Sequence, residues 1–421
     1  MKQSFDYQIR HIQLAESMDL PPISTNETGW YLVFWWRQIP IGHLFVEPGD
    51  VITPDELAEK CWQAIQPTLL AYRASQTESA LTDGAATTRP ANLQEVLSTT
   101  LSTYDLESLP AEVPISVVIC TRNRAADLQI ALQALKDLPC KPAEIVVVDN
   151  APTDNSTARV VEKFPDVIYC HEPRPGLDIA RNSGIRMATM PVMAYVDDDV
   201  QVHAHWAYHI WKTFQDESVA AMTGLVIAAE LNTEAQLIFE KHWSFNRGYI
   251  DKTYDAAYLN RTLFAGPPIW EIGAGANMAF RRDLFATTGY FDERLDVGAA
   301  GCNGDSEMWF RILTHGYSVH YNPRAVVFHK HRQQLPALKK QLFSYMRGHT
   351  AAALIQQAYH PSAGYRRHVF KSLPLYYLHY LKAGFPSYGF RYQTIGMEIR
   401  GALSGVLFYL KNRNRPSQPN V

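Results

Sequence analysis

The sequence is poor in cysteine and lacks any long run of apolar residues. Its 421 residues include five cysteines, which are scattered, odd in number and form no C-x-x-C pair. This pattern argues against a disulfide framework and a structural zinc site and favours a reducing compartment. No run approaches the roughly 18 apolar residues that a spanning helix needs, and the N-terminus, MKQSFDYQIRHIQ, is too polar for a signal peptide. We therefore expect a cytoplasmic protein, in solution or bound peripherally at the inner face of the plasma membrane.

Acidic residues are nearly absent from the last 114 positions. After Glu307 the chain has sixteen Lys and Arg and one acid, Glu398, so this part carries +15 while the first 307 residues carry −18. One reading is an anionic partner for the C-terminal part, such as an anionic membrane surface. The other is that the two parts neutralise each other across an internal interface. We do not expect a nucleic acid among the partners.

The N-terminal part has a β-rich texture. The run Trp30–Val46 (WYLVFWWRQIPIGHLFV) is typical of a hairpin with an irregular turn, and Thr53 followed by proline marks a helix start. The stretch Ala74–Pro90 is polar and favours a linker. We predict a small α+β accessory domain over residues 1–80 and a linker over 81–112.

From Val113 onward, buried apolar runs alternate with helical spacing. The expected strands are Ile115–Cys120, Glu144–Val148, Val167–Cys170 and Val192–Val196. The expected helices are Ala126–Leu138, Ser156–Phe164, Leu335–Tyr359 and Gln393–Lys411. Such runs predict an α/β domain over 113–332, with a mostly parallel sheet covered on both faces, and a basic helical region over 333–421. Ligands of these sheets bind beyond the carboxyl ends of the strands.

Three adjacent carboxylates, Asp197, Asp198 and Asp199, follow the strand that ends at Val196. Held together, they repel one another, and a divalent cation between them relieves that repulsion. Oxygen ligands suit Mg²⁺ or Mn²⁺, which could then bridge a diphosphate. The alternative is a solvated acidic turn, but the position at the end of a strand favours the metal.

Polar side chains also follow the first two strands and open a later helix. They are Thr121, Arg122, Arg124, Asp149, Asn150 and Arg181. Hydroxyl and guanidinium groups can donate to phosphate, and an acid at such a position can accept from a nucleobase or ribose. The alternatives are an Asx turn at Asp149 and a surface salt bridge at Arg181.

Asp305 and Glu307 come after a glycine-rich stretch, 298–304, and head a helix. A carboxylate beside such a loop fits a general base under a mobile cover, although acids also stabilise a helix N-terminus through capping and the dipole. His329 shares a strand face with His331 and is a candidate further metal ligand, with a packing role as the alternative.

Small and aromatic residues supply the candidates for acceptor contacts. The run Gly273–Met278 lacks the third glycine of a dinucleotide-binding motif, and its small residues, Gly275 before Asn277 among them, would let a substrate approach the backbone. Trp270 and Trp309 could stack on sugar rings, and the alternative for each is a place in the core.

Six ordered motifs together resemble family 2 glycosyltransferases with the GT-A fold. They are VVICTRNR (117–124), EIVVVDNAPTD (144–154), GLDIARNSGI (176–185), VMAYVDDDV (192–200), GAGANMAFRRDLFATTGYFDERL (273–295) and GDSEMWFRILTHGY (304–317). The resemblance covers roughly residues 114–331. It implies an inverting, metal-dependent enzyme that takes a UDP-, GDP- or dTDP-sugar, and it likens the N-terminal segment to an accessory domain of some bacterial members.

The resemblance also implies roles for individual residues. Asp199 matches the direct metal ligand and Asp197 the acid near the ribose, while Asp149 matches the base-binding acid. Thr121 and Arg181 match nucleotide contacts. Asp305 matches the general base, but Gly304 stands where the family often has glutamate, so Glu307 competes for that role.

The resulting hypothesis is transfer of a sugar to a hydroxyl acceptor, a saccharide or a lipid-linked molecule, in polysaccharide or glycolipid synthesis. Two alternatives stay open: a sugar nucleotidyltransferase, which would need a glycine-rich loop that Thr121–Arg124 lacks, and a non-catalytic nucleotide-sugar-binding protein.

Overall fold

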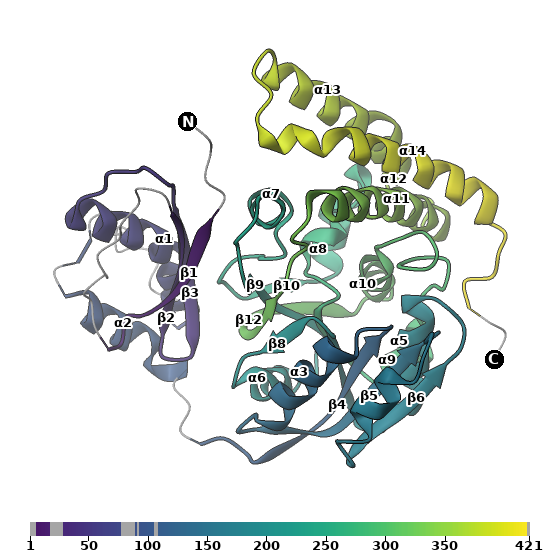
Figure 1. Ribbon diagram of the computed structural model, residues 1–421, viewed down its shortest axis with the longest axis horizontal. Helices are drawn as coiled ribbons and strands as arrows, with labels where there is room; N and C mark the ends of the chain where they lie inside the picture. Colours follow the sequence, from purple (N-terminus) through teal and green to yellow (C-terminus); the bar gives the residue numbers. More distant parts are fainter. Residues whose placement is uncertain (1–5, 17–27, 77–88, 91, 105–107, 419–421) are drawn as a thin grey trace.

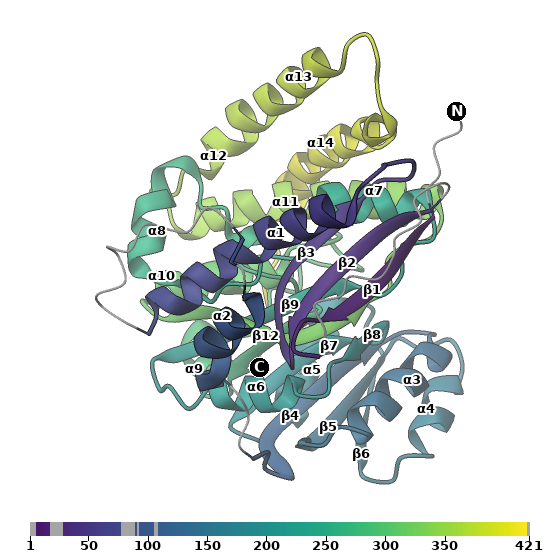
Figure 2. The same cartoon turned by 90° about the vertical axis from the view of Figure 1, so that its left-hand side faces the viewer.

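Two β-sheets and a C-terminal group of helices make up the computed structural model (Figure 1). It describes residues 6–16, 28–76, 89–90, 92–104 and 108–418. The small N-terminal sheet stands beside the large central sheet, and the C-terminal helices lie across the far end of the molecule (Figure 2).

The N-terminal sheet consists of β1 (Tyr7–Gln13), β2 (Gly29–Trp36) and β3 (Ile39–Val46). Strands β2 and β3 form the predicted hairpin, with Arg37 in the left-handed region at φ 52°. Strand β1 pairs with β2 in parallel, and the sequence did not suggest it because its side chains are largely polar.

Two helices cover one face of this sheet. Helix α1 (Pro54–Ala74) begins at the expected cap, where Thr53 and Glu56 form a reciprocal capping box. Helix α2 (Leu93–Leu101), followed by the short turn η1 (Ser102–Tyr104), places its leucines in the same apolar core. Part of the segment expected as a linker therefore belongs to this domain, because leucines four residues apart form one face of a helix. Most of the proposed linker, 77–88 and 91, lies outside the described residues.

The central sheet has the strand order β10-β12-β9-β11-β7-β4-β5-β6, with β8 paired to β12. Its strands are β4 (Glu112–Thr121), β5 (Lys141–Asn150), β6 (Val167–Glu172), β7 (Val192–Asp197), β8 (Val200–Val202), β9 (Val219–Ala228), β10 (Lys252–Tyr254), β11 (Asn277–Arg281) and β12 (Ser318–His329). Strands β6, β5, β4 and β7 are mutually parallel, and β11 runs antiparallel between β7 and β9. The expected mixed, mostly parallel α/β architecture is confirmed.

Helices cover both faces of this sheet. Helices α3 (Ala125–Lys136), α4 (Ser156–Val161) and α6 (Trp206–Thr213) bury their apolar residues in one layer. The other layer receives α5 (Leu177–Met187), α7 (Glu234–Trp243), α8 (Ala256–Thr262), α9 (Leu284–Thr288) and α10 (Gly304–Thr314), with the turns η2 (Leu263–Ala265) and η3 (Ile269–Glu271) between them. This two-sided burial explains why the strands read as unbroken apolar runs.

The C-terminal region is helical, as expected. It comprises α11 (Leu335–Tyr359), α12 (Tyr365–Arg367), the π-turn η4 (His368–Ser372), α13 (Leu373–Gly384), η5 (Phe390–Gln393) and α14 (Ile395–Asn412). Gly401 and Gly405 let α14 lie directly on α11, since a Cβ at either position would meet an α11 carbonyl oxygen at 2.4 Å. Over the described residues, no helix combines the length and the apolar character that crossing a bilayer would require.

Polar bridges and rings fasten the N-terminal sheet to the central domain. Arg324 pairs with Asp251 at 2.6 Å and donates to the Tyr72 hydroxyl at 3.0 Å. Trp35 stacks on His203 with 5.2 Å between ring centroids and donates to His11 Nδ1 at 2.9 Å. The Arg324–Tyr72 hydrogen bond and the Trp35–His203 stack each join a residue of the N-terminal part to one of the central domain, so the two sheets are packed together.

The joining surface holds three histidines whose pKa values are lowered: His209 is buried, His203 half-buried and His11 exposed. Burial lowers the pKa of His11, lowers that of His203 to about 4 and lowers that of His209 well below its usual value. The folded protein therefore resists protonation at this surface, whereas the unfolded chain accepts protons near pH 6.5.

We expect the free energy of unfolding to fall as the pH is lowered from 7.5 to 5.5. The unfolded chain binds protons at these histidines over this interval, whereas His203 and His209 in the folded protein do not, so these two each contribute about 1 kcal/mol of lost stability at pH 5.5. Urea titrations at the two pH values measure the difference. His203→Gln should show a smaller pH dependence than the unaltered protein, and equal slopes for both would contradict this explanation.

Candidate active site

A cavity of about 1320 Å³ lies beyond the carboxyl ends of β4, β5 and β7. Its walls come from those strand ends, from the loop 296–303 with the start of α10, and from the C-terminal helices. This is where ligands of open α/β sheets bind, and most of the residues singled out from the sequence line it.

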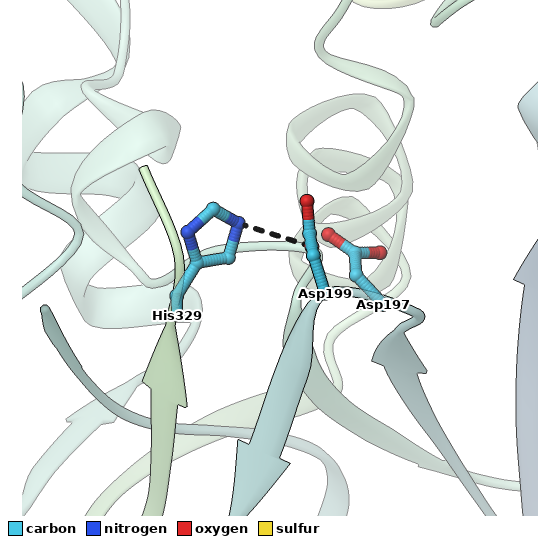
Figure 3. A group of neighbouring side chains, drawn as sticks. All are labelled: Asp197, Asp199 and His329. Carbon is cyan, nitrogen blue, oxygen red and sulfur yellow. Dashed lines mark ion pairs between the residues drawn. The ribbon is translucent and has the colours of Figure 1, made fainter. Parts of the chain in front are cut away.

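Asp197, Asp199 and His329 form a cluster in this cavity (Figure 3). Asp197 ends β7, Asp199 follows in the turn to β8, and His329 ends β12. One ligand atom from each lies within 4.8 Å of the others, and His329 Nε2 is 3.5 Å from Asp199 Oδ1. Two carboxylate oxygens and an imidazole nitrogen form a donor set that suits Mn²⁺.

The cluster is electrostatically strained when no cation is present. Burial, followed by repulsion from Asp199, raises the pKa of Asp197 to about 7. Burial lowers the pKa of His329 to about 4, so its ring is neutral and keeps a lone pair at neutral pH. A divalent cation would restore the charge of Asp197 and occupy that lone pair.

The middle acid of the run is bound by protein groups. Asp198 accepts from Thr121 Oγ1 and from Arg124 Nη1, each at 2.6 Å, and Arg124 also reaches Asp199 at 3.0 Å. Thr121 and Arg124 therefore hold the acids in place. Arg122 lines the cavity, is exposed, and has no ion-pair partner among the described residues, which leaves its guanidinium available to a phosphate.

Asp149 and its neighbour Asn150 differ in access to the cavity. Asp149 is fully buried, accepts from the Tyr169 hydroxyl at 2.8 Å, and is not part of the cavity lining. Burial raises its pKa. Asn150 does line the cavity, and its amide donates to the Arg174 carbonyl and accepts from the Gly176 N–H.

Arg181 lies against the cavity floor and is neutralised from within the protein. Its Nη1 donates to Asp178 at 2.9 Å and to Asp296 at 2.7 Å. These partners replace the surface salt bridge considered from the sequence, because Arg181 is 4% exposed. Its other nitrogen approaches Gly275, where a Cβ would lie 2.7 Å from Nη2 and 3.1 Å from Asp305 Oδ2. Gly275 is therefore needed for the close approach of these three residues.

Only one of the two candidate base residues faces the cavity. Asp305, in the first turn of α10, lines it and accepts from the Ser306 N–H through Oδ1 at 2.6 Å. Burial raises the pKa of Asp305. Glu307 does not line the cavity, because its carboxylate is held by Arg311 Nε at 2.7 Å in the interior. The expectation that Glu307 competes for the base role is therefore wrong.

Of the four residues predicted to contact the acceptor, two line the cavity and two are buried elsewhere. Trp270 and Gly275 line the cavity. Trp309 is fully buried in the core. The amide of Asn277 accepts a hydrogen bond from Trp206 Nε1 and donates to the carbonyls of Leu225 and Ala325. Neither Trp309 nor Asn277 can touch an acceptor, because both are fully buried and outside the cavity lining.

The structure adds residues that sequence reasoning did not find. His349 of α11 and His368 of η4 contact each other at 2.9 Å between Nε2 atoms and pack against the Trp270 ring at 4.7 and 5.3 Å between centroids. Arg247, from the loop after α7, also lines the cavity. No local motif marks these three positions, since only the tertiary fold brings them together.

Part of the central domain matches a known family. Residues 116–289 match the model of Glycosyl transferase family 2. The matched segment begins within β4, contains β5 to β7 and β11, and ends before α10.

The relatives share moderate similarity. The chain is 26% identical over 275 residues to the pre-mycofactocin glycosyltransferases of two Mycobacterium tuberculosis strains, covering 64% of this chain and 54% of theirs. It thus spans about half the length of those relatives. It is 23% identical over 232 residues to the glucosyl-dolichyl phosphate glucuronosyltransferase of Haloferax volcanii, covering 51% of this chain and 69% of that one.

A solved mannosyltransferase from Pyrobaculum calidifontis, in complex with GDP-Man and Mn²⁺, aligns with a TM-score of 0.45 and 19% identity. The alignment covers 70% of this chain and 87% of that one.

The two acids of α10 should respond differently to loss of charge. Glu307→Gln leaves the buried Arg311 without its carboxylate, and we expect the free energy of unfolding to fall by about 3 kcal/mol. Asp305→Asn should cost less than about 1 kcal/mol, because Asp305 has no ion-pair partner among the described residues and its loss of charge leaves no paired cation behind. Urea denaturation of both variants at pH 7.5 measures this contrast, and equal losses would contradict it.

Proposed function

We propose that this chain is an inverting, metal-dependent glycosyltransferase that moves a sugar from a nucleotide-sugar donor to a hydroxyl of an acceptor. The observation that carries the proposal is that the Asp197, Asp199 and His329 cluster and Asp305 line one cavity beside a family 2 domain. The donor would be a UDP-, GDP- or dTDP-sugar.

Asp199, Asp197 and His329 would hold the divalent metal, Mn²⁺ or Mg²⁺. When bound, such an ion stabilises the negative charge that develops on a departing nucleoside diphosphate. Thr121 and Arg124 keep the acids in place through Asp198. Arg122 and Asn150, at the ends of β4 and β5, are positioned to contact the donor.

Asp305 would act as the general base. Its Oδ1 is fixed by the Ser306 N–H, and its other oxygen can take the proton from an acceptor hydroxyl as that oxygen attacks the anomeric carbon. A carboxylate with a raised pKa is better matched to this task near neutral pH.

Most carboxylates near the cavity are paired with arginines, which supports a mechanism with a single displacement at the anomeric carbon. Asp178 and Asp296 are paired with Arg181, and Glu307 is paired with Arg311. Among the described cavity acids outside the metal cluster, Asp305 and the exposed Glu271 lack an ion pair, and Asp305 is the half-buried one, beside Gly275. One base without a second carboxylate as nucleophile leads to inversion at the anomeric carbon.

Binding and turnover can be separated by two substitutions. A panel of UDP-, GDP- and dTDP-sugars is screened for thermal stabilisation with and without Mn²⁺, and the best donor is followed by its hydrolysis or transfer. Asp199→Ala should abolish the Mn²⁺-dependent part of donor binding. Asp305→Asn should keep that binding and lower turnover by roughly 10²- to 10⁴-fold.

A surface variant remote from the cavity, Ile130→Ser on α3, serves as the control. Near-full turnover of Asp305→Asn, or unchanged activity in excess chelator, would contradict the proposed mechanism.

The C-terminal helices support a second part of the proposal, peripheral binding to an anionic membrane. Leu403, Leu407 and Leu410 project from the outer side of α14 and are 53–63% exposed, and the lone acid of this region, Glu398, is buried against Arg391. Helix α13 lies at the outer edge of the molecule beside α14 (Figure 2), packed through Tyr377, with Leu375 and Leu378 exposed. Apolar side chains among uncompensated cations suit an anionic bilayer.

This surface adjoins the cavity. Leu373, Tyr376 and Tyr377 of α13 are part of the cavity lining. A lipid-linked acceptor at a membrane could therefore extend its saccharide from α13 toward Asp305. Such an arrangement fits a role in polysaccharide or glycolipid synthesis.

Flotation with vesicles tests the membrane part. The protein should bind phosphatidylglycerol vesicles more tightly than phosphatidylcholine vesicles, and salt should weaken that binding. The double variant Leu403→Ser/Leu407→Ser should bind at least about tenfold more weakly, since burial of each leucine contributes roughly 1.5–3 kcal/mol. Ile130→Ser, which removes an equally exposed residue from α3, is the matched control. Binding that ignores lipid charge, or equal binding by both variants, would refute the assignment.

A further inference from the structure

Arg247 is a cation in the cavity wall that the proposed mechanism does not use. It lies in the loop between α7 and β10 and is fixed by two backbone carbonyls. Its Nη1 donates to the Ser244 carbonyl at 2.6 Å and its Nη2 to the Trp270 carbonyl at 3.0 Å. Its Nε has no hydrogen-bond partner among the described residues. The guanidinium is thus held in a defined position with part of its donor capacity unused.

Three other arginines of the cavity are neutralised by carboxylates. Arg124 pairs with Asp198 and Asp199, and Arg181 pairs with Asp178 and Asp296. Arg391 is likewise paired, with Glu398. Over the described residues, no carboxylate comes within 4.0 Å of Arg247. Arg247 and Arg347 are thus half-buried cavity arginines without an ion pair among the described residues; Arg347 lies over the Phe408 ring at 4.7 Å, whereas two backbone carbonyls fix Arg247.

The groups around Arg247 also leave its positive charge without a contacting carboxylate. Burial lowers its pKa, and Tyr321, Glu271, Tyr254 and Asp305 oppose that effect only through electrostatic attraction without an ion pair. An uncompensated charge in a partly desolvated wall is costly, and a bound anion would remove that cost.

The position of Arg247 separates it from the region proposed for the donor. Its neighbour in the loop, Phe245, packs edge-on against His329 with 5.5 Å between ring centroids. On the other side Arg247 is bonded to the backbone of Trp270, whose ring faces the histidines of α11 and η4. Arg247 thus lies between the metal cluster and the Trp270 wall, beyond the ends of β4 and β5.

We propose that Arg247 binds an anionic group, a phosphate or a carboxylate, carried by the acceptor. The proposal rests on the proposed function, because it assumes that the donor diphosphate occupies the Asp197, Asp199 and His329 cluster. A planar guanidinium with fixed orientation can hold either group through two parallel hydrogen bonds. It would place the acceptor along the Trp270 ring with a hydroxyl directed toward Asp305.

The test is a comparison of neutral and anionic sugars on the protein already loaded with a nucleoside diphosphate and Mg²⁺. Occupying the donor region first removes the phosphate contacts at Arg122 and at the cluster. Glucose, glucose 6-phosphate and glucuronate are then titrated calorimetrically. Glucose 6-phosphate or glucuronate should bind on the order of tenfold more tightly than glucose, and the stronger of the two identifies the anion.

Two variants assign the preference to Arg247. Arg247→Met should bind all three sugars equally, and Arg247→Lys should retain part of the preference, because it keeps the charge and loses the fork. Lys340→Met removes an exposed cation from the lining of the same cavity, and its preference for the anionic sugar should remain.

The outcomes separate this inference from the proposed function. If no nucleoside diphosphate binds, the proposed function fails first. If the nucleoside diphosphate binds but the three sugars bind equally, or not at all, the anion subsite is refuted while the proposed function stands. A preference that survives in Arg247→Met, or disappears in Lys340→Met, also refutes the assignment to Arg247.

Discussion

The crowding of carboxylates at one edge of the central sheet is the constraint on which the site depends. Parallel strands end side by side, so the acids that follow them are forced into a common, partly desolvated space. The protein compensates most of them itself: Arg124 and Thr121 serve Asp198, and Arg181 serves the pair Asp178 and Asp296. Arg124 also pairs with Asp199, whereas Asp197 has no ion-pair partner among the described residues, so its charge lies where a cation could be accepted and released.

Much of the fold follows from local patterns in the sequence. The apolar runs around Ile115–Cys120 and Val192–Val196 became β4 and β7 because both faces of the sheet are covered. The span Leu335–Tyr359 is helix α11 as predicted. Strand β1 and helix α2 were missed because polar residues dominate both segments, and each is held by a partner that lies elsewhere in the chain.

The candidate site was predictable in its acids and less so in its partners. Asp197, Asp199 and Asp305 follow strand or helix boundaries that the sequence marks, and all line one cavity. Glu307 was misjudged because two residues along a helix reverse the direction of a side chain. The bond from Arg181 to Asp296 joins positions 115 apart in the chain, and no local spacing encodes such a contact.

The cavity is lined by two stretches of chain, one inside and one outside the segment that matches the family model. The strand ends that would receive the donor lie within residues 116–289, the segment that matches the family. Asp305, His329 and the histidine pair on α11 and η4 all come after residue 289. In the proposed mechanism the donor thus binds to the earlier stretch, and the acceptor contacts much of the later one. The later stretch could therefore change in sequence while the donor-binding stretch is kept. A chimera that exchanged only residues after 332 would inherit its donor from one parent and much of its acceptor wall from the other.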